Sequence, residues 1–565
     1  MRRLGYRRAE SPPAMAQPAA RRLVEHGQGR AERVRHVTIG EWESPERAEP
    51  IEREGTRGYS PFRRRQTVAP YLEAAALCAL IALSLGLRVV NLGALPIFFD
   101  ESEYVHSAAI VGAASDPSSW LASLHYGVPP LFSWLAAPLT RVVPDTLLAA
   151  RLTSAVIGAL TLLATWATAR LLGGRAVGLV AAAIFALCPF AVFYNRMGML
   201  DGLVAACGAG ALLFALRLSR QGRRVDAVAL GLFLAAGLLT KIFAFALLLL
   251  PLLAVIAALP EQRRSVRRGA LLAATIAVGS YVGLLLLPQS TSLLALAQQH
   301  SHPPGSVAAV VGGQLAAWAT ALWLYITPPV IVLALVGLWV DRRQRATLLI
   351  GPWAVLGSLP PVLLPQPYLA PRYVLYIAVP IAVLAARGVV AVATTLTVSA
   401  PRRIRPALGW ALLFPLTALT VGPAAGADTA IVSAPARAPL TAFDRWQYIT
   451  GWPSGYAFMR TVAYLRGQER DGNLTVVSSI LNPPGDALAV VLGHDRHARL
   501  LTIDFAMLSG YAQQLAPGAR VYLIACHPYG QSLPHAADRR ALRLVLSVPN
   551  GDGNGGDDVY RVTRL

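Results

Sequence analysis

Long apolar stretches alternate with short polar segments through most of this 565-residue sequence. From Tyr71 to about Val421, each apolar stretch approaches the roughly 20 residues that an α-helix needs to cross a bilayer. Because backbone polar groups in hydrocarbon must be satisfied within the segment, the pattern predicts transmembrane helices rather than strands. We count about eleven of them, at roughly 71–92, 146–172, 175–194, 199–218, 226–240, 242–259, 269–288, 319–340, 346–364, 373–397 and 406–423.

The two ends of the chain have different patterns. Residues 1–69 are polar, rich in Arg, Glu, Pro and Gly, and typical of a disordered tail. After about residue 424, short β-type runs separated by Gly, Pro and Asp predict a small α/β domain. These runs are Leu474–Ser478, Val521–Ala525, Leu542–Val548 and Val559–Thr563. The sequence therefore predicts a disordered basic cytoplasmic tail (1–69), an all-α polytopic membrane domain (70–424) and an extracytoplasmic α/β domain (425–565).

The placement of charge orients the predicted helices. Charged residues make up only 14% of the chain, against about 25% in an ordinary soluble domain. A net charge of +21 would by itself suggest nucleic acid. However, the arginines gather in the tail and in four loops, near 217–224, 263–268, 342–345 and 402–405, that share one side of the helix count. By the positive-inside rule this side is cytoplasmic. We therefore expect a multi-pass cell-membrane protein that contacts membrane lipids and binds no nucleic acid.

The opposite loops, which face outward in this orientation, contain ionisable residues that are costly near a membrane and usually functional. The first outer loop contains Asp100, Glu101, Tyr104 and His125; the later ones contain Arg196, Asp201, Lys241, Arg372 and Tyr373. Acids and bases on one membrane face predict a site that deprotonates one substrate and binds an anion of another. A carboxylate is suited to the first task, and arginine or lysine to the clamping of a phosphate.

Each of these residues also has a purely structural interpretation. Asp100 is a favoured residue for capping a helix, Arg196 and Asp201 are close enough in sequence to form an ion pair, and Arg372 is suited to anchor a helix at the interface. Lys241 can extend from a helix end toward water. Among 51 lysines and arginines, however, Lys241 is the one lysine, which favours a site that uses a compact ammonium group.

Five short motifs, in this order along the chain, resemble a known family. They are Phe99-Asp100-Glu101, Pro129-Pro130-Leu131, the turn Tyr194…Arg196…Asp201, Gly237-Leu-Leu-Thr240-Lys241 and Pro371-Arg372-Tyr373. Over about 70–420 the chain resembles the polytopic glycosyltransferases of the C-type fold, specifically the protein O-mannosyltransferase and aminoarabinose transferase group. The tail and the C-terminal domain lie outside the resemblance.

The resemblance implies transfer of a sugar from a polyprenyl-phosphate donor to an extracytoplasmic acceptor, which is a protein, a lipid or a glycan. Asp100 takes the role of the family's catalytic base, and Glu101 that of a neighbouring acid that tunes it or helps to bind a metal. The candidates for binding the donor phosphate or the substrates are Arg196, Asp201, Lys241, Arg372, Tyr373, Tyr104 and His125. Relatives often carry a lysine immediately before the Pro-Pro pair, whereas this chain has Val128. The missing charge then comes from Arg196, Lys241 or His125, or the donor is held differently.

The expected mechanism is a single displacement that inverts the anomeric carbon, because it needs only one carboxylate base and cations on the leaving phosphate. A metal, the class of protein and the role of one segment remain open at this stage. A divalent metal is a further option, with His300 and His302 as ligands, although two loop histidines are more often simply polar. A transporter or flippase of lipid-linked sugars would place charges near the bilayer midplane, so charges in the loops of one face favour an enzyme. The segment from Tyr448 to Tyr456 is either a guide for the acceptor or a packed turn.

Overall fold

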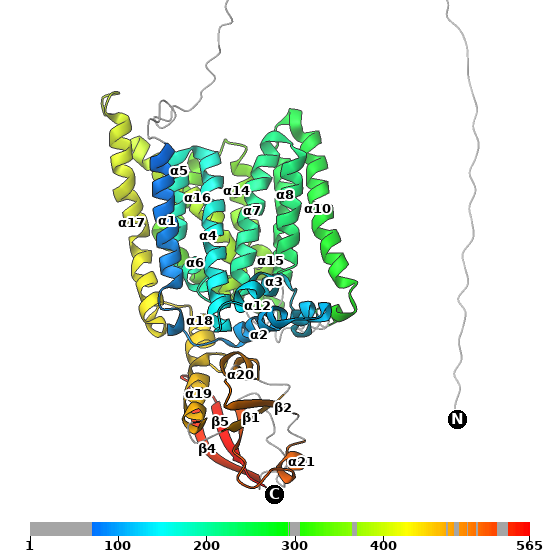
Figure 1. Ribbon diagram of the computed structural model, residues 1–565. Helices are drawn as coiled ribbons and strands as arrows, with labels where there is room; N and C mark the ends of the chain where they lie inside the picture. Colours follow the sequence, from blue (N-terminus) through cyan, green and yellow to red (C-terminus); the bar gives the residue numbers. More distant parts are fainter. Residues whose placement is uncertain are drawn as a thin grey trace, which may run out of the picture. The chain divides into compact units, whose positions relative to one another are not determined.

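The computed structural model describes residues 70–291, 293, 306–363, 370–469, 473–479, 485–493, 495–503, 507–527 and 541–564. The predicted tail, 1–69, lies outside these ranges. Within them the chain forms a set of long helices followed by a small sheet (Figure 1). The predicted fold class, an all-α membrane domain with a small C-terminal α/β domain, is confirmed.

Seven helices in the described part of the chain are long and apolar enough to cross a membrane. They are formed by α1 (Pro70–Val89), α4 (Thr146–Gly173), α7 (Leu200–Gln221), α10 (Arg263–Leu285), α12 (Val307–Ala321) with η6 (Leu322–Ile326), η7 (Pro371–Ile377) with α16 (Ala378–Leu396), and α17 (Arg405–Ser433). The remaining predicted stretches contain shorter apolar helices. They are α5 (Arg175–Ala186), α6 (Pro189–Tyr194), α8 (Arg224–Leu238), η3 (Ile242–Leu248), α9 (Leu249–Ala257), α13 (Pro328–Val340), α14 (Thr347–Leu356) and α15 (Leu359–Leu363). The total of about eleven crossings stays a prediction.

One helix lies where the sequence pattern suggested a loop. The chain from Val307 to Ile326 is helical, although most of it falls in the predicted outer loop 289–318. The stretch predicted as one helix over 319–340 is divided at Thr327, which has a positive φ of 70° and precedes two prolines. Proline cannot donate a backbone hydrogen bond and disfavours helical geometry in the residue before it. The break therefore has a local cause.

Helices α13 and α16 pack with their backbones in close approach. A Cβ atom on Gly337 would lie 2.0 Å from the carbonyl oxygen of Leu384, and one on Gly388 would lie 2.0 Å from that of Leu333. Small residues at a helix crossing allow this approach, which supplies the van der Waals contact that holds helices together in lipid. The two glycines thus fix α16, and with it η7, which carries Arg372.

The first outer loop folds into short helices: η1 (Leu92–Ala94), α2 (Phe99–Ala113), η2 (Pro117–Tyr126) and α3 (Leu131–Thr140). Figure 1 shows α2 and α3 at one end of the long helices, the end from which the C-terminal part of the chain continues. Short connecting turns elsewhere are η4 (Pro260–Gln262), η5 (Pro288–Ser290) and η8 (Pro435–Arg437).

The last long helix, α17, continues to Ser433, beyond the predicted domain boundary at 424. The chain then forms α18 (Ala442–Arg445), η9 (Trp446–Thr450) and α19 (Gly455–Glu469) before it enters the sheet. Through η9 and the turn after it, this connecting segment contacts the start of α2, since the amide of Phe99 donates a hydrogen bond to the carbonyl oxygen of Pro453 (3.1 Å). The connection is therefore packed against the first outer loop.

The C-terminal sheet has five strands in the order β2-β1-β3-β5-β4. Strand β1 is parallel to β2 and β3, and β5 is antiparallel to β3 and β4. All four predicted strands are present, as β1 (Leu474–Ser479), β3 (Val521–His527), β4 (Leu542–Pro549) and β5 (Gly556–Val562). Strand β2 (Ala498–Ile503) was not predicted; it is an edge strand whose side chains are all at least partly exposed. The described part of the domain also contains two short helices, α20 (Gly485–Leu492) and α21 (Leu508–Gln513).

Candidate active site

The start of α2 is fixed by a buried carboxylate. Glu101 is fully buried, and Arg151 of α4 donates to both of its oxygens, at 2.8 and 2.7 Å. The same oxygens accept the amide hydrogens of Gly198 (2.6 Å) and Phe98 (3.2 Å). Arg151 also donates to the carbonyl oxygens of Leu92 and Leu95. The carboxylate of Glu101 thus joins the first turn of α2 to α4 and to the turn before α7.

Asp100, the residue before Glu101, lies on the accessible side of the same turn. Its Oδ2 accepts a hydrogen bond of 2.6 Å from the guanidinium of Arg372. The side chain of Asp100 is 26% exposed, whereas that of Arg372 is 3% exposed. Arg372 is held from its other side, because it donates to the hydroxyl of Tyr448 (2.7 Å) and to Gln447 (3.1 Å) in η9. One oxygen of Asp100 is therefore anchored by a buried cation.

A second acid and a second cation adjoin this pair. Asp201, in the first turn of α7, accepts a hydrogen bond of 2.8 Å from Lys241, and its other oxygen lies 3.7 Å from Nε of Arg372. Lys241 lies between α8 and η3 and keeps 13% of its side chain exposed. Two predicted cations and two predicted acids, from four separate segments, thus form one charged cluster, which we define as Asp100, Asp201, Lys241 and Arg372.

Aromatic rings border the charged cluster. The ammonium of Lys241 lies 4.4 Å from the ring centroid of Tyr373, which stacks on Phe243. Tyr104 is buried in α2, and its pKa is raised well above the usual value, first by burial and then by the charge of Asp100. Cations over ring faces gain electrostatic attraction. The two predicted tyrosines therefore adjoin the cluster.

Two other predicted residues have different surroundings. Arg196 donates hydrogen bonds to the carbonyl oxygens of Leu87, Val90 and Asn91, at and just beyond the end of α1, and so caps that helix. The predicted alternative, an ion pair between Arg196 and Asp201, does not form, because Asp201 pairs with Lys241 and Arg372. His125 is exposed near the end of η2, edge-on to Tyr126.

A further group of polar residues was not identified from the sequence. Nδ1 of His106, in α2, lies 2.6 Å from Oδ1 of Asp486, in α20. The hydroxyl of Tyr126 donates a hydrogen bond to the same oxygen (2.7 Å). Glu103 lies in α2 between Asp100 and His106; burial, followed by the charges of Asp100 and Asp486, raises the pKa of its carboxyl to about 9. Asp100, Glu103 and His106 recur at every third position, which would place them on one face of a helix. That spacing could have indicated this group from the sequence.

The segment from Tyr448 to Tyr456 packs against α2. Tyr448 is buried, its ring centroid lies 4.6 Å from that of Phe98, and Trp452 packs against Phe99 at 5.5 Å. These contacts favour the interpretation of a packed turn.

A metal site was the other open question. The described residues contain no group of three or more His, Cys, Asp and Glu side chains placed to hold a metal ion. The predicted ligands His300 and His302 lie outside the described residues.

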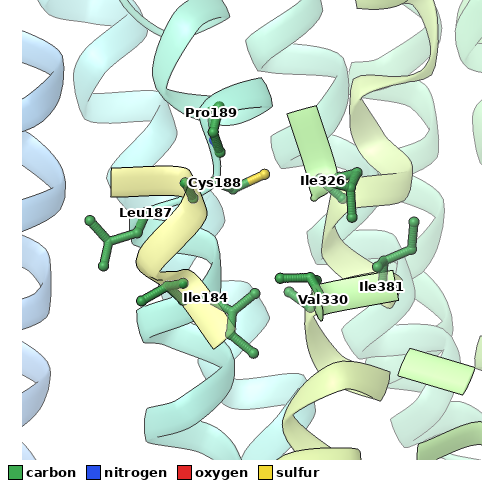
Figure 2. A pocket seen from close by; sticks show the side chains of 11 residues that line it. Ile184, Leu187, Cys188, Pro189, Ile326, Val330 and Ile381 are labelled. Carbon is green, nitrogen blue, oxygen red and sulfur yellow. The ribbon is translucent and has the colours of Figure 1, made fainter. Parts of the chain in front are cut away.

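A separate apolar crevice lies among the long helices. Figure 2 shows aliphatic side chains, among them Ile184, Ile326, Val330 and Ile381, gathered around it together with Cys188. None of the residues that line it is charged. The crevice is therefore a gap in the apolar packing and contributes no chemistry to the charged cluster.

Comparisons with known proteins concern the family and the fold. Residues 127–285 match the family model described as dolichyl-phosphate-mannose-protein mannosyltransferase. This stretch includes Pro129-Pro130 and Lys241 but neither Asp100 nor Arg372. No curated protein matches the sequence.

Among solved structures, the chain is similar to ArnT from Cupriavidus metallidurans, both in the apo state and bound to undecaprenyl phosphate. Each of these structures has a TM-score of 0.57 and 14% sequence identity, and the match covers 87% of this chain and 97% of ArnT. At this identity the likeness shows the fold. The chain has the fold of the polytopic C-type glycosyltransferases, and the resemblance inferred from the five motifs is confirmed.

Proposed function

We propose that this chain is a membrane glycosyltransferase that moves a sugar from a polyprenyl-phosphate donor to an acceptor on the outer side of the membrane. One observation carries the proposal. Asp100 is anchored through Oδ2 by Arg372, and within the described residues no protein hydrogen bond is made to its Oδ1, on a side chain that is 26% exposed. A carboxylate that is oriented by one oxygen and open at the other is suited to accept a proton from a bound hydroxyl.

The reaction that we propose is a single displacement. The acceptor hydroxyl donates its proton to Asp100 as its oxygen attacks the anomeric carbon, and the bond to the polyprenyl phosphate breaks on the opposite side. The anomeric centre inverts, and the phosphate leaves as an anion. This chemistry requires one carboxylate base and positive charge at the leaving group, in contrast to the paired carboxylates of hydrolases. The similar structure of ArnT with undecaprenyl phosphate supports this class of donor.

We assign the leaving phosphate first to Lys241. Its side chain is 13% exposed, and among the described residues its ammonium makes one hydrogen bond, to Asp201. The side chain of Arg372 is 3% exposed and is already bound by Asp100, Tyr448 and Gln447. A phosphate that approaches the cluster therefore reaches Lys241 at a lower cost in broken hydrogen bonds. Arg372 then acts mainly through Asp100, which it keeps oriented.

The other predicted residues receive more limited roles. Glu101 has its carboxylate fully occupied by Arg151 and two backbone amides, so we assign it the positioning of α2 rather than the transfer of a proton. Arg196 caps α1 and is assigned no contact with the donor. Tyr104 and Tyr373 border the cluster and are assigned to the sugar or phosphate, and His125 to the rim of the first outer loop.

The test is sugar transfer by the purified full chain in detergent. Tritium-labelled mannosyl, arabinosyl and aminoarabinosyl undecaprenyl phosphates are supplied as donors, and envelope material from a strain that lacks the protein is supplied as acceptor. The proposal expects label to move from the lipid extract into the acceptor fraction together with release of undecaprenyl phosphate. A flippase has no bilayer to cross in detergent and would transfer no sugar. Absence of transfer from all three donors, combined with donor translocation in vesicles, would favour the transporter.

A further inference from the structure

The helix that carries Asp100 is held on two sides. On the side of the long helices, Glu101 binds Arg151 and Asp100 binds Arg372. On the other side, α2 meets the C-terminal sheet domain through the first turn of α20. The link is Asp486, whose Oδ1 receives the hydroxyl hydrogen of Tyr126 (2.7 Å) and lies 2.6 Å from Nδ1 of His106.

Three separate segments meet at that one oxygen atom. His106 comes from α2, Tyr126 from the end of η2, and Asp486 from a domain about 360 residues further along the chain. The hydroxyl of Tyr126 also lies 3.4 Å from Nδ1 of His106, so that the three side chains form a closed set of contacts. The side chains of His106 and Asp486 are 29% and 23% exposed. Partial burial strengthens such polar contacts relative to contacts in open water.

Position along α2 gives this contact its importance. Asp100 lies in the first turn of the helix, Glu103 one turn later and His106 one turn after that. The electrostatic effect of Asp486 reaches Glu103, the residue midway between His106 and Asp100. The contacts of Glu101 fix the beginning of α2, and the contact of Asp486 fixes its middle. Arg141, which follows α3, also donates a hydrogen bond to the carbonyl oxygen of Gly112 in the last turn of α2 (2.6 Å). The helix is therefore tied at both ends, and Asp486 adds a contact at its middle that fixes the direction of the intervening turns.

We propose that Asp486 is a positioning residue for sugar transfer, which acts by holding His106 and Tyr126 and thereby fixes α2 and the direction in which Asp100 is presented. This inference rests on the proposed function, since it assigns to the C-terminal domain a part in the same reaction. A displacement of about 1 Å in a catalytic group can lower a rate by about 10²-fold. Loss of the contact is therefore expected to lower kcat more than it changes the KM for the donor.

The experiment compares Asp486→Ala, Asp486→Asn and the control Asp495→Asn in the purified full chain. Asp495 follows the other end of α20 and accepts a hydrogen bond from the amide of His497 within the same domain. Asparagine at 486 keeps an oxygen that can accept the Tyr126 hydroxyl. We therefore expect kcat to be highest in the control, lower in Asp486→Asn and lowest in Asp486→Ala. The kcat of the alanine variant should be about 10- to 100-fold below that of the control. Adding Tyr126→Phe to Asp486→Ala should reduce kcat by less than Tyr126→Phe does alone.

Hydrogen exchange supplies a second measurement that does not depend on sugar transfer. Asp486→Ala should speed amide exchange in peptides that cover 99–113, and Asp495→Asn should leave it unchanged. Unchanged exchange in α2, or faster exchange with kcat equal to that of the control, would overturn the positioning role. If the unsubstituted protein transfers no sugar, the proposed function fails and the kinetic role of Asp486 fails with it. In that case hydrogen exchange still decides whether Asp486 holds α2.

Discussion

The carboxylate of Asp100 and the guanidinium of Arg372, 272 residues apart in sequence, are joined by a hydrogen bond of 2.6 Å. The acid is partly exposed and the arginine is buried. Because Arg372 is also bound by Tyr448 and Gln447, the pair has a fixed orientation. The first outer loop, η7 and the segment after α17 therefore meet at the proposed base.

Replacement of Asp100 by asparagine should abolish most sugar transfer while the protein still folds. Asparagine keeps the shape of the side chain and an oxygen for Arg372, but it cannot accept a proton as a base. General-base catalysis contributes about 10²- to 10⁴-fold, and a loss in that range is expected in single-turnover transfer. Asp116→Asn is the matched control, because Asp116 caps η2 in the same outer loop and asparagine caps helices equally well. Transfer by Asp100→Asn at the level of this control would end the assignment.

Glu101, although it adjoins Asp100, should behave as a structural residue. It is fully buried and bidentate with Arg151. Removal of one partner from a buried ion pair typically costs about 3–5 kcal/mol, because the other charge remains unpaired. Glu101→Gln should therefore lower the Tm in detergent strongly, and Glu101→Gln with Arg151→Met should recover part of the loss. A Glu101→Gln protein with an unchanged Tm and no transfer would instead identify Glu101 as a catalytic acid.

The sequence predicted those parts of the site that carry an unusual residue in an unusual place. Asp100 lies in the first outer loop, and Asp201, Lys241 and Arg372 lie at or near the ends of predicted helices. Charge near the membrane is costly enough to indicate function. The structure brings these four together. The prediction that the four residues share the outer face of the membrane also required the orientation of the helices. That orientation was inferred from the four arginine-rich loops.

The partners of these residues could not be predicted from the sequence. Arg151 lies near the start of a largely apolar stretch, and its link to Glu101 depends on how α4 packs against the first outer loop. Asp486 lies 380 residues from His106 in a segment without any distinctive motif. Long-range packing, rather than local pattern, decides both of these partners. Strand β2 was missed for a local reason, because its short run from Ala498 to Ile503 includes Arg499 and has no fully buried side chain.

Lys241 should tolerate arginine better than alanine. Its ammonium binds Asp201 at 2.8 Å and lies over the ring of Tyr373, and a guanidinium keeps the charge that a donor phosphate requires. A charge-assisted hydrogen bond is worth about 1.5–3 kcal/mol, so Lys241→Ala should lower kcat/KM for the donor by roughly 10- to 100-fold. Lys241→Arg should lower it by less. Equal losses in the two variants would remove the phosphate role.

Glu103 should make the stability of the protein fall as the pH rises. Burial and two neighbouring acids raise the pKa of its carboxyl from 4.5 to about 9, so the folded protein keeps a proton that the unfolded chain loses above about 4.5. The free energy of unfolding then decreases between these two values. Glu103→Gln removes this titration, and its Tm relative to that of the unsubstituted protein should be higher at pH 8.5 than at pH 5. A difference in Tm that is the same at both pH values would contradict the raised pKa.

Reporter fusions test the orientation on which the outer location of the site depends. The arginine clusters near 217–224 and 342–345 predict that a reporter protein fused after residue 224 or 345 lies in the cytoplasm. Because α17 continues to Ser433, the fusion for the C-terminal side belongs after residue 440, ahead of α18. An alkaline phosphatase there, active only outside the cytoplasm, should be active, and the same reporter after 224 or 345 should be inactive. The opposite pattern at all three positions would place Asp100 and Lys241 on the cytoplasmic face, where cytoplasmic acceptors would have to be sought.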